Sequence, residues 1–384
     1  MALHISKQVR QLGEQAQAEL REQFARIDAI AQENTQRVLE AFQDHRVADA
    51  YFAGTTGYGY DDEGRDNLER VYADVFHTEA ALVRPQITCG THALAVALSA
   101  NLLPGDELLS PVGAPYDTLE EVIGIRESKC SLKEYGVTYA QADLKPDGTF
   151  DYDAIREKIN GRTKLITIQR SKGYATRPSF SVRQIGELIA FCKGIKPDVK
   201  IMVDNCYGEF TQKEEPCQAG ADLVVGSLIK NPGGGIAPTG GYIAGRKDLV
   251  ELCAYRLNAP GLGKELGCTL ETPRDMYLGF YYAPGVVCEA IKTAIYAQCL
   301  LELVGKKPIP RYCEAHNDIV TCFDAGTADA LIGFCRGVQA ASPVDSYAAP
   351  EPSPEPGYTD EVIMASGSFT QGSTCLLYTS PSPR

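Results

Sequence analysis

The first forty residues carry apolar side chains at helical spacing. Between Ile5 and Phe42 an apolar residue returns every three or four positions, as at Leu20, Phe24 and Ile27. This spacing predicts one or two amphipathic helices. We expect residues 1–52 to form a helical arm that packs against the rest of the chain.

The pattern changes between Ala80 and Gly245, where short apolar runs alternate with helical patterns. Asp66 is a plausible cap for the helical pattern NLERVYADVF just before this region. Such alternation predicts an α/β fold with a mostly parallel sheet covered by helices, in which ligands bind at the carboxyl ends of the strands. The apolar runs are ALVRPQITC, DELLSP, KLITIQ, KIMVDN, DLVVGS and GGYIAG.

A second, smaller unit is expected after the sheet. A long helix is predicted over Val286–Leu303, and the strand pattern EVIMASGSF follows later in the chain. The end of the sequence, GSTCLLYTSPSPR, is rich in turn residues and is expected to complete no element. We therefore expect a large domain over residues 53–283 and a small C-terminal α+β domain over residues 284–374.

Composition narrows the classes of partner. The 384 residues include 37 basic and 50 acidic side chains, a net charge of −13, which argues against nucleic acid or an anionic membrane as the main partner. Thirteen cysteines without a CxxC pair fit a reduced compartment. The N-terminus lacks the pattern of a signal peptide, and no run of about 18 apolar residues occurs. We expect a cytoplasmic enzyme.

The strongest chemical signal is Lys230 in GSLIKNPGGG, downstream of Asp204 in VDNCYGEF. A lysine that forms an imine needs a rigid, partly desolvated position, because a solvated ammonium is protonated at neutral pH. The apolar run ADLVVGSLI supplies that setting. An aspartate at a strand end could keep the ring nitrogen of pyridoxal phosphate protonated and make the ring an electron sink. The pair indicates a pyridoxal phosphate site.

Three further residues could bind the phosphate. Gly90 and Thr91 open the helical pattern GTHALAVALSANL, where free amides and the helix dipole favour an anion. A glycine before a helix is common, and a simple capping turn is the alternative reading. Ser227 could add a hydroxyl from the strand that leads to Lys230, although an isolated serine is equally consistent with a capping role.

Other polar and aromatic residues follow predicted strand ends. Tyr116 could stack on the pyridine ring, and His92 competes for that role. Arg170 and Ser171 could approach the phenolic oxygen of the cofactor or the carboxylate of the substrate. Arg177 is equally consistent with a surface position. Neither GxxxxGK[ST] nor GxSxG occurs, and the Cys and His residues lack metal-ligand spacing, so no metal is expected.

The chain resembles the fold-type I pyridoxal phosphate enzymes, and within them the aluminium resistance or methionine gamma-lyase family. The resemblance spans roughly residues 53–374 and is carried by six motifs. They are TGYGYDDEGRDNLE, RPQITCGTHALA, IQRSKGY, VDNCYGEF, GSLIKNPGGGIAPTGGYIAG and GVQAASPVDS. It implies a seven-stranded, mostly parallel sheet and a carbon–sulfur lyase that eliminates a thiol from methionine, cystathionine or a cysteine-like amino acid.

The resemblance also implies roles for single residues. Lys230 would form the internal aldimine and Asp204 would pair with the pyridinium, while the substrate carbanion forms on the cofactor. Tyr116 would stack, and the remaining cofactor-binding residues would be Gly90, Thr91, His92, Ser171 and Ser227. Tyr58, Tyr60 and Arg65 would contact a neighbouring subunit, so a homodimer or homotetramer with sites at the dimer interface is implied.

The chain departs from the family at its end, where CLLYTSPSPR resembles foreign sequence. We therefore expect residues 375–384 to be a non-native tail, and an arginine for the substrate carboxylate to be missing. Two other functions stay open at this point. One is another reaction of the same cofactor, such as aminotransfer, because fold and lysine are shared across these chemistries. The other is a catalytically impaired protein that serves only in assembly.

Overall fold

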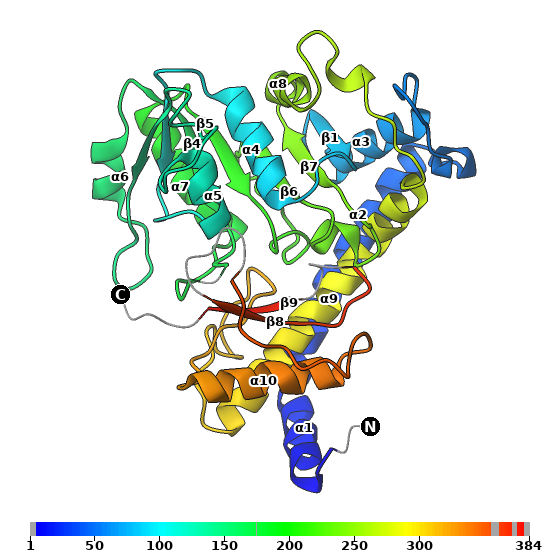
Figure 1. The fold of residues 1–384 in the computed structure, drawn as a ribbon, viewed down its shortest axis with the longest axis vertical. Coiled ribbons are helices and arrows are strands. Elements are labelled where there is room, and N and C mark those ends of the chain that lie inside the picture. The colour runs from blue at the N-terminus through cyan, green and yellow to red at the C-terminus, as the bar shows by residue number, and fades with distance from the viewer. Residues whose placement is uncertain (1–4, 174, 355–360, 371–374, 380–384) are drawn as a thin grey trace.

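A computed structural model describes residues 5–173, 175–354, 361–370 and 375–379 (Figure 1). Its largest feature is a seven-stranded sheet with the strand order β1-β7-β6-β5-β4-β2-β3. β7 runs antiparallel to both of its neighbours, and the other pairs are parallel, which confirms the predicted mostly parallel α/β sheet. The strands are β1 (Ala80–Arg84), β2 (Glu107–Ser110), β3 (Thr138–Gln141), β4 (Thr163–Gln169), β5 (Lys200–Asp204), β6 (Leu223–Ser227) and β7 (Gly241–Gly245).

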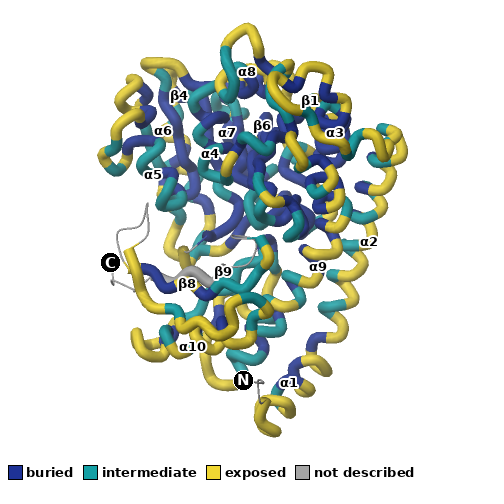
Figure 2. The backbone as a smooth tube through the Cα atoms, turned by 45° about the vertical axis from the view of Figure 1, so that its right-hand side comes forward, coloured by how far each residue is buried: buried dark blue, intermediate teal, exposed yellow. Residues whose placement is uncertain are grey.

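The central strands are buried on both faces (Figure 2). Ile201 and Val203 of β5 lie in one apolar cluster, whereas Met202 between them lies in another, because successive side chains of a strand point to opposite faces. Helices cover both faces. The first face carries α3 (Glu63–Val75), α6 (Tyr152–Lys158) and α7 (Val182–Ile195), and the second carries α4 (Gly90–Asn101), α5 (Asp117–Ile123) and α8 (Lys247–Leu257).

The apolar runs predicted six of the seven strands. The missed strand, β3, lies at the edge of the sheet, and its four residues are half-buried or exposed. An edge strand that is not buried on both faces needs no continuous apolar run. The predicted cap of α3 is also wrong. The carboxylate of Asp62, not that of Asp66, accepts the hydrogen bond from the backbone N–H of Arg65, so the helix begins at Glu63.

The N-terminal arm forms two helices, α1 (Lys7–Glu19) and α2 (Arg21–Asp44), as predicted. α2 lies beside the long helix α9 (Pro273–Leu303) in Figure 1, and the two are packed together. The predicted start of this long helix is wrong, because α9 begins thirteen residues before Val286, at Pro273. Pro284 lies inside the helix, so the expected domain boundary at residues 283–284 falls in mid-helix.

The C-terminal region contains α10 (Ala328–Ala341) and a two-stranded antiparallel sheet of β8 (Val362–Ser366) and β9 (Cys375–Thr379). β8 confirms the predicted strand. The expectation that the tail completes no element is wrong for Cys375–Thr379, whose backbone pairs with β8. Residues 380–384 lie outside the described part of the chain. Three single-turn helices complete the set, η1 (Asp49–Phe52), η2 (Asn231–Gly233) and η3 (Gly263–Glu265).

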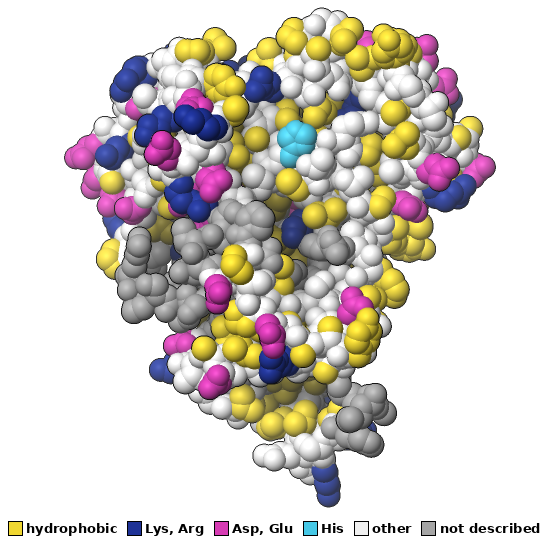
Figure 3. All heavy atoms as spheres, in the orientation of Figure 1, with side chains coloured by type: hydrophobic (Ala, Val, Ile, Leu, Met, Phe, Trp, Pro, Cys, Tyr) yellow, Lys and Arg dark blue, Asp and Glu magenta, His cyan; other side chains and the backbone are white. Residues whose placement is uncertain are grey.

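The surface is mixed in charge. On the face shown in Figure 3, acidic and basic side chains are interspersed with apolar ones. Among the described residues, no helix is both long and apolar enough to cross a membrane.

The loop after β6, residues 228–236, is called the lysine loop here, and it packs backbone to backbone against α9. A Cβ atom at Gly279 would lie 2.2 Å from the carbonyl oxygen of Gly233, and one at Gly234 would lie 2.4 Å from that of Gly279. Real Cβ atoms do not approach backbone oxygens this closely. The glycines therefore fix the distance between α9 and the lysine loop.

We predict that Gly279→Ala destabilises the fold by about 2–4 kcal/mol, because the new methyl group meets backbone that cannot yield. The measurement is the urea midpoint of unfolding. Gly285→Ala, on the same helix, is the matched control. Nothing lies within 4 Å of its added Cβ, so the better helix propensity of alanine should stabilise by about 0.5–1 kcal/mol. Equal midpoints for the two variants would contradict the close-packing interpretation.

Candidate active site

The candidate site lies where β4, β5 and β6 end. Asp204 is the last residue of β5 and Ser227 is the last residue of β6, as the sequence predicted. Both side chains are at most 8% exposed. Because the strands are parallel neighbours, their carboxyl ends form one edge of the sheet.

Asp204 is a buried carboxylate with little compensation. Its Oδ1 accepts a hydrogen bond of 3.1 Å from the backbone N–H of Cys206. Burial raises the pKa of Asp204 to about 6, although that hydrogen bond and the charge of Arg177 oppose the rise. A carboxylate held this way gains from a cationic partner, and a protonated ring nitrogen would be one.

The start of α4 faces the same edge of the sheet. Cys89 caps the helix, and its Sγ accepts a hydrogen bond of 3.4 Å from the backbone N–H of His92. A Cβ atom at Gly90 would lie 3.2 Å from Sγ of Cys206 and 3.6 Å from Cβ of Ser227. The glycine therefore lets the helix start approach both strand ends, and its first amides are suited to an anion.

Tyr116 and Thr91 belong to adjoining elements. Tyr116 immediately precedes α5, and its Cδ2 would lie 3.5 Å from a Cβ at Gly173, in the loop after β4. The hydroxyls of Thr91 and Thr118 lie 2.7 Å apart and join α4 to α5. The Nδ1 atom of His92 accepts a hydrogen bond of 3.2 Å from the backbone N–H of Thr88, which holds its ring against its own turn.

Lys230 lies in the lysine loop, and its backbone N–H donates to the carbonyl of Ser227 at 3.2 Å. Its Nζ is 4.9 Å from the centre of the Tyr207 ring. Burial raises the pKa of the Cys206 thiol well above its ordinary value, and the nearby charge of Lys230 opposes this. The lysine therefore lies beside the turn that follows Asp204.

Ser171 has a bonded partner of its own. Its hydroxyl donates to Oδ2 of Asp318 at 2.8 Å, and the backbone N–H of Lys172 donates to the same oxygen at 3.2 Å. Asp318 is 1% exposed and comes from the segment between α9 and α10. These bonds join the C-terminal region to the loop after β4.

The structure corrects the expectations for both arginines of that loop. Arg170 is completely buried, and its guanidinium donates to Asn205 at 2.8 Å and pairs with Glu215 at 3.5 Å, so it cannot approach a ligand as expected. Arg177 is not a free surface residue. Its Nη2 donates to the carbonyls of Gln169 and Ser171, and burial lowers its pKa to about 10.

Tyr58 and Tyr60, which were expected to contact a neighbouring subunit, lie on a loop before α3. This loop forms backbone hydrogen bonds with residues 267–270. Tyr58 and Tyr60 are 70% and 54% exposed, and their rings lie 5.4 Å apart. Arg65 differs from the expectation, because it is 2% exposed and donates to the carbonyls of Gly59 and Gly267. Through these bonds Arg65 positions the loop that carries Tyr58 and Tyr60 within its own chain.

Sequence reasoning missed three residues around the site, which are Cys206, Tyr207 and Asp318. The first two follow a strand that ends in Asp204, so their position directly after the strand end was a usable signal. The contact of Asp318 with Ser171 spans 147 residues and leaves no local pattern.

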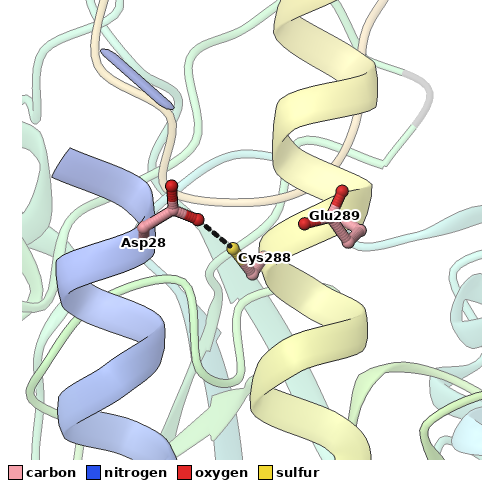
Figure 4. A group of neighbouring side chains, drawn as sticks. All are labelled: Asp28, Cys288 and Glu289. Carbon is pink, nitrogen blue, oxygen red and sulfur yellow. Dashed lines mark hydrogen bonds between the residues drawn. The ribbon is translucent and has the colours of Figure 1, made fainter. Parts of the chain in front are cut away.

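A separate group joins α2 to α9. The carboxylates of Asp28 and Glu289 and the thiol of Cys288 lie within 4.8 Å of one another (Figure 4). Cys288 donates to Asp28 at 3.5 Å, and the ammonium of Lys292 pairs with both carboxylates. Because Lys292 already pairs with both carboxylates, we interpret the group as an ion-pair cluster that holds two helices together.

Comparison with known proteins identifies relatives over most of the chain. The sequence model described as "Methionine gamma-lyase" matches residues 9–383. The chain is 49% identical over 353 residues to the uncharacterized protein YnbB of Bacillus subtilis, covering 91% of this chain and 84% of that protein.

Solved structures extend the likeness to the fold. A carbon-sulfur lyase involved in aluminum resistance from Clostridium novyi shares 47% identity at a TM-score of 0.92, covering 96% of this chain and 87% of its own. The pyridoxal-5'-phosphate dependent protein YhfS of Escherichia coli, at 18% identity and a TM-score of 0.61, shares the fold over 90% of both chains. The expected resemblance is confirmed, and the chain belongs to the methionine gamma-lyase family of fold-type I enzymes.

Proposed function

We propose that the protein is a pyridoxal 5'-phosphate-dependent carbon–sulfur lyase that eliminates a thiol from a sulfur-containing amino acid. The observation that carries the proposal is the buried carboxylate of Asp204 at the end of β5. The turn that follows Asp204 carries Cys206 and Tyr207, and the Tyr207 ring contacts Nζ of Lys230. Membership of the methionine gamma-lyase family supports the reaction class.

The residues at the site fit the cofactor. Asp204 is a buried carboxylate that lacks a strong cationic partner among the described residues, and a protonated pyridine nitrogen would supply one. Gly90 lets the start of α4 approach the ends of β5 and β6 closely, so that its first backbone amides and the Ser227 hydroxyl could bind a phosphate. When bound, pyridoxal phosphate supplies an electron sink for a carbanion at the substrate α-carbon.

Each of the chain's own residues then has a defined task. Asp204 keeps the ring nitrogen protonated, and Gly90, Thr91 and Ser227 bind the phosphate. Tyr116 covers the ring face beside the loop after β4. Lys230 holds the cofactor before substrate arrives and afterwards takes the α-proton of the substrate.

Two of the expected cofactor contacts take supporting tasks. The hydroxyl of Ser171 already donates to Asp318, so it can accept one more hydrogen bond from a ligand while it remains fixed. His92 is held by Thr88 and supports the phosphate turn, and Tyr116 remains the residue proposed to stack.

The leaving group can depart from the β-carbon or the γ-carbon. β-Elimination suits cystathionine or a cysteine-like substrate, and γ-elimination suits methionine after a second proton transfer. Both release a thiol and, after hydrolysis of the enamine, ammonia and a 2-oxo acid. Pyruvate would indicate β-elimination, and 2-oxobutyrate with methanethiol would indicate γ-elimination of methionine.

We also propose that two copies of the chain complete each site. Tyr58 and Tyr60 form an exposed aromatic pair on a loop fixed by Arg65, and exposed aromatic side chains are common at interfaces. Sedimentation of the purified protein with cofactor tests this, because a monomer with full activity would contradict it.

Lys230→Ala should lower elimination by at least about 10³-fold, because the variant lacks the group that moves the α-proton. Thiol and 2-oxo acid are measured together for cystathionine, cysteine and methionine. Lys145→Ala, at an exposed lysine, is the matched control. In the parent protein, borohydride reduction should fix the cofactor on the peptide that contains Lys230. Full activity in Lys230→Ala would contradict the proposal, and amino-group transfer to a 2-oxo acid without thiol would indicate an aminotransferase.

Asp204→Asn should stabilise the cofactor-free protein at pH 8 by about 2–3 kcal/mol while it weakens cofactor binding. The pKa of Asp204 in the folded protein, about 6, exceeds the ordinary value of the carboxyl. Ionisation therefore lowers the stability of the fold progressively as the pH rises from the unfolded pKa to about 6, and fully above that pH. Below the unfolded pKa it has no effect. The gain in urea midpoint should therefore vanish near pH 4.

Asp222→Asn provides the opposite control. Asp222 is also buried, but its carboxylate accepts a hydrogen bond from the backbone N–H of Ile201 and pairs with Lys193. Its substitution should destabilise the fold at pH 8. A loss of stability for Asp204→Asn at pH 8 would contradict the assignment of Asp204 as an uncompensated charge.

A further inference from the structure

Tyr207 occupies a backbone conformation that a tyrosine rarely adopts. It is the third residue of a four-residue turn after β5, closed by a 2.8 Å hydrogen bond from the N–H of Gly208 to the carbonyl of Asn205. Its φ is +69°, in the left-handed region that favours glycine. Such a conformation persists only where the surrounding structure enforces it, and its presence is a reason to ask what the side chain does.

Buried polar groups hold the turn and the residues that follow it. The two carboxylate oxygens of Glu215 accept hydrogen bonds from the N–H of Phe210 at 2.9 Å and from the Nδ2 of Asn205 at 3.0 Å. Phe210 is itself at φ +61°. Glu215 and Asn205 are completely buried. The network therefore supports two unfavourable backbone conformations, one in the turn and one two residues after it.

The result of this arrangement is the position of the Tyr207 ring. Its centre lies 4.9 Å from Nζ of Lys230, a distance at which an aromatic face attracts an ammonium. The lysine loop is fixed to the same turn, because Nδ2 of Asn231 donates to the carbonyl of Glu209 at 3.0 Å. The ring and the amine are thus held against each other by bonds on both sides of the contact.

We propose that Tyr207 is a positioning residue for Lys230, and that its ring holds the amine in place and favours its protonated form. This inference rests on the proposed function. When Lys230 takes the α-proton, the electron pair of the C–H bond stays with the substrate carbon and a positive charge appears on Nζ. The face of Tyr207 stabilises that charge until the lysine returns the proton at a later step.

Asp204, Cys206 and Glu209 are the titratable neighbours of Tyr207 along the chain. Burial raises the pKa of the Cys206 thiol and that of the Glu209 carboxyl well above their ordinary values, which disfavours the anion of each group. Asp204 bonds to the N–H of Cys206 and is assigned to the cofactor. The aromatic face of Tyr207 contacts the ammonium directly, with Nζ 4.9 Å from the ring centre.

The test measures the protonation of Lys230 in the full chain without cofactor, so it does not depend on catalysis. Trace acetic anhydride labels amines only when they are unprotonated, and peptide mass gives the labelling of Lys230 across a pH series. Removal of the ring in Tyr207→Leu should move the midpoint downward by about half to one pH unit. Tyr207→Phe keeps the ring face and should leave the midpoint unchanged.

Tyr207→Gly separates the loss of the ring from a loss of structure. Glycine accepts the positive φ without strain, so this variant should fold at least as stably as the parent and still show the lowered midpoint. The labelling midpoint of the exposed Lys145, measured in the same samples, should be the same in every variant. An unchanged Lys230 midpoint in both Tyr207→Leu and Tyr207→Gly would overturn the inference.

The outcome is distinguishable from a failure of the proposed function. A shifted midpoint in a protein that eliminates no thiol would retain the role of Tyr207 and reject the lyase assignment. An unchanged midpoint in an active lyase would retain the lyase assignment and reject the role of Tyr207.

Discussion

The buried ion pair between Arg170 and Glu215 is the interaction on which the rest of the site depends. Both side chains are completely buried, so their desolvation is costly and is offset only because each has further hydrogen-bond partners. Arg170 also binds the side chain of Thr211, and both charged residues bind that of Asn205. Replacing one charge would leave the other buried and unpaired. We infer that the pair is retained for what it positions, namely the turn that follows Asp204.

Three sets of contacts therefore keep the site rigid. Through Glu215, the ion pair fixes the chain just after the turn that follows β5. The glycine contacts between α9 and the lysine loop fix the segment that carries Lys230. Neither set of contacts touches a ligand. The hydrogen bonds of Asp318 to the loop after β4 add a third constraint from the C-terminal region. Substitutions far from the chemistry should for this reason act through the geometry of a few loops.

The sequence was sufficient to predict the regularly alternating strands and helices of the large sheet. Buried parallel strands need continuous apolar runs, and for this reason the strands ending in Asp204 and Ser227 could be predicted together with the sheet. Features decided by tertiary contact could not. Pro284 appears as a helix breaker in the sequence but lies inside α9. Arg170 was expected near a ligand and Arg177 was equally consistent with a surface position, yet the first belongs to a buried ion pair and the second binds backbone carbonyls. The contact of the Tyr207 ring with Lys230 depends on a left-handed backbone conformation that leaves no apolar or polar pattern in the sequence.

The packing of α2 against α9 has a consequence for synthesis of the chain. α2 buries Val38 and Ala41 in the same cluster as Val287 and Ile291 of α9, and Asp44 precedes Pro273 by 229 positions. Ribosomes add about 5–20 residues per second, so the apolar stripe of α2 waits on the order of tens of seconds for its partner helix. During that interval the nascent chain exposes a surface suited to chaperones, and α2, although it leaves the ribosome before the sheet, is among the last elements to become native.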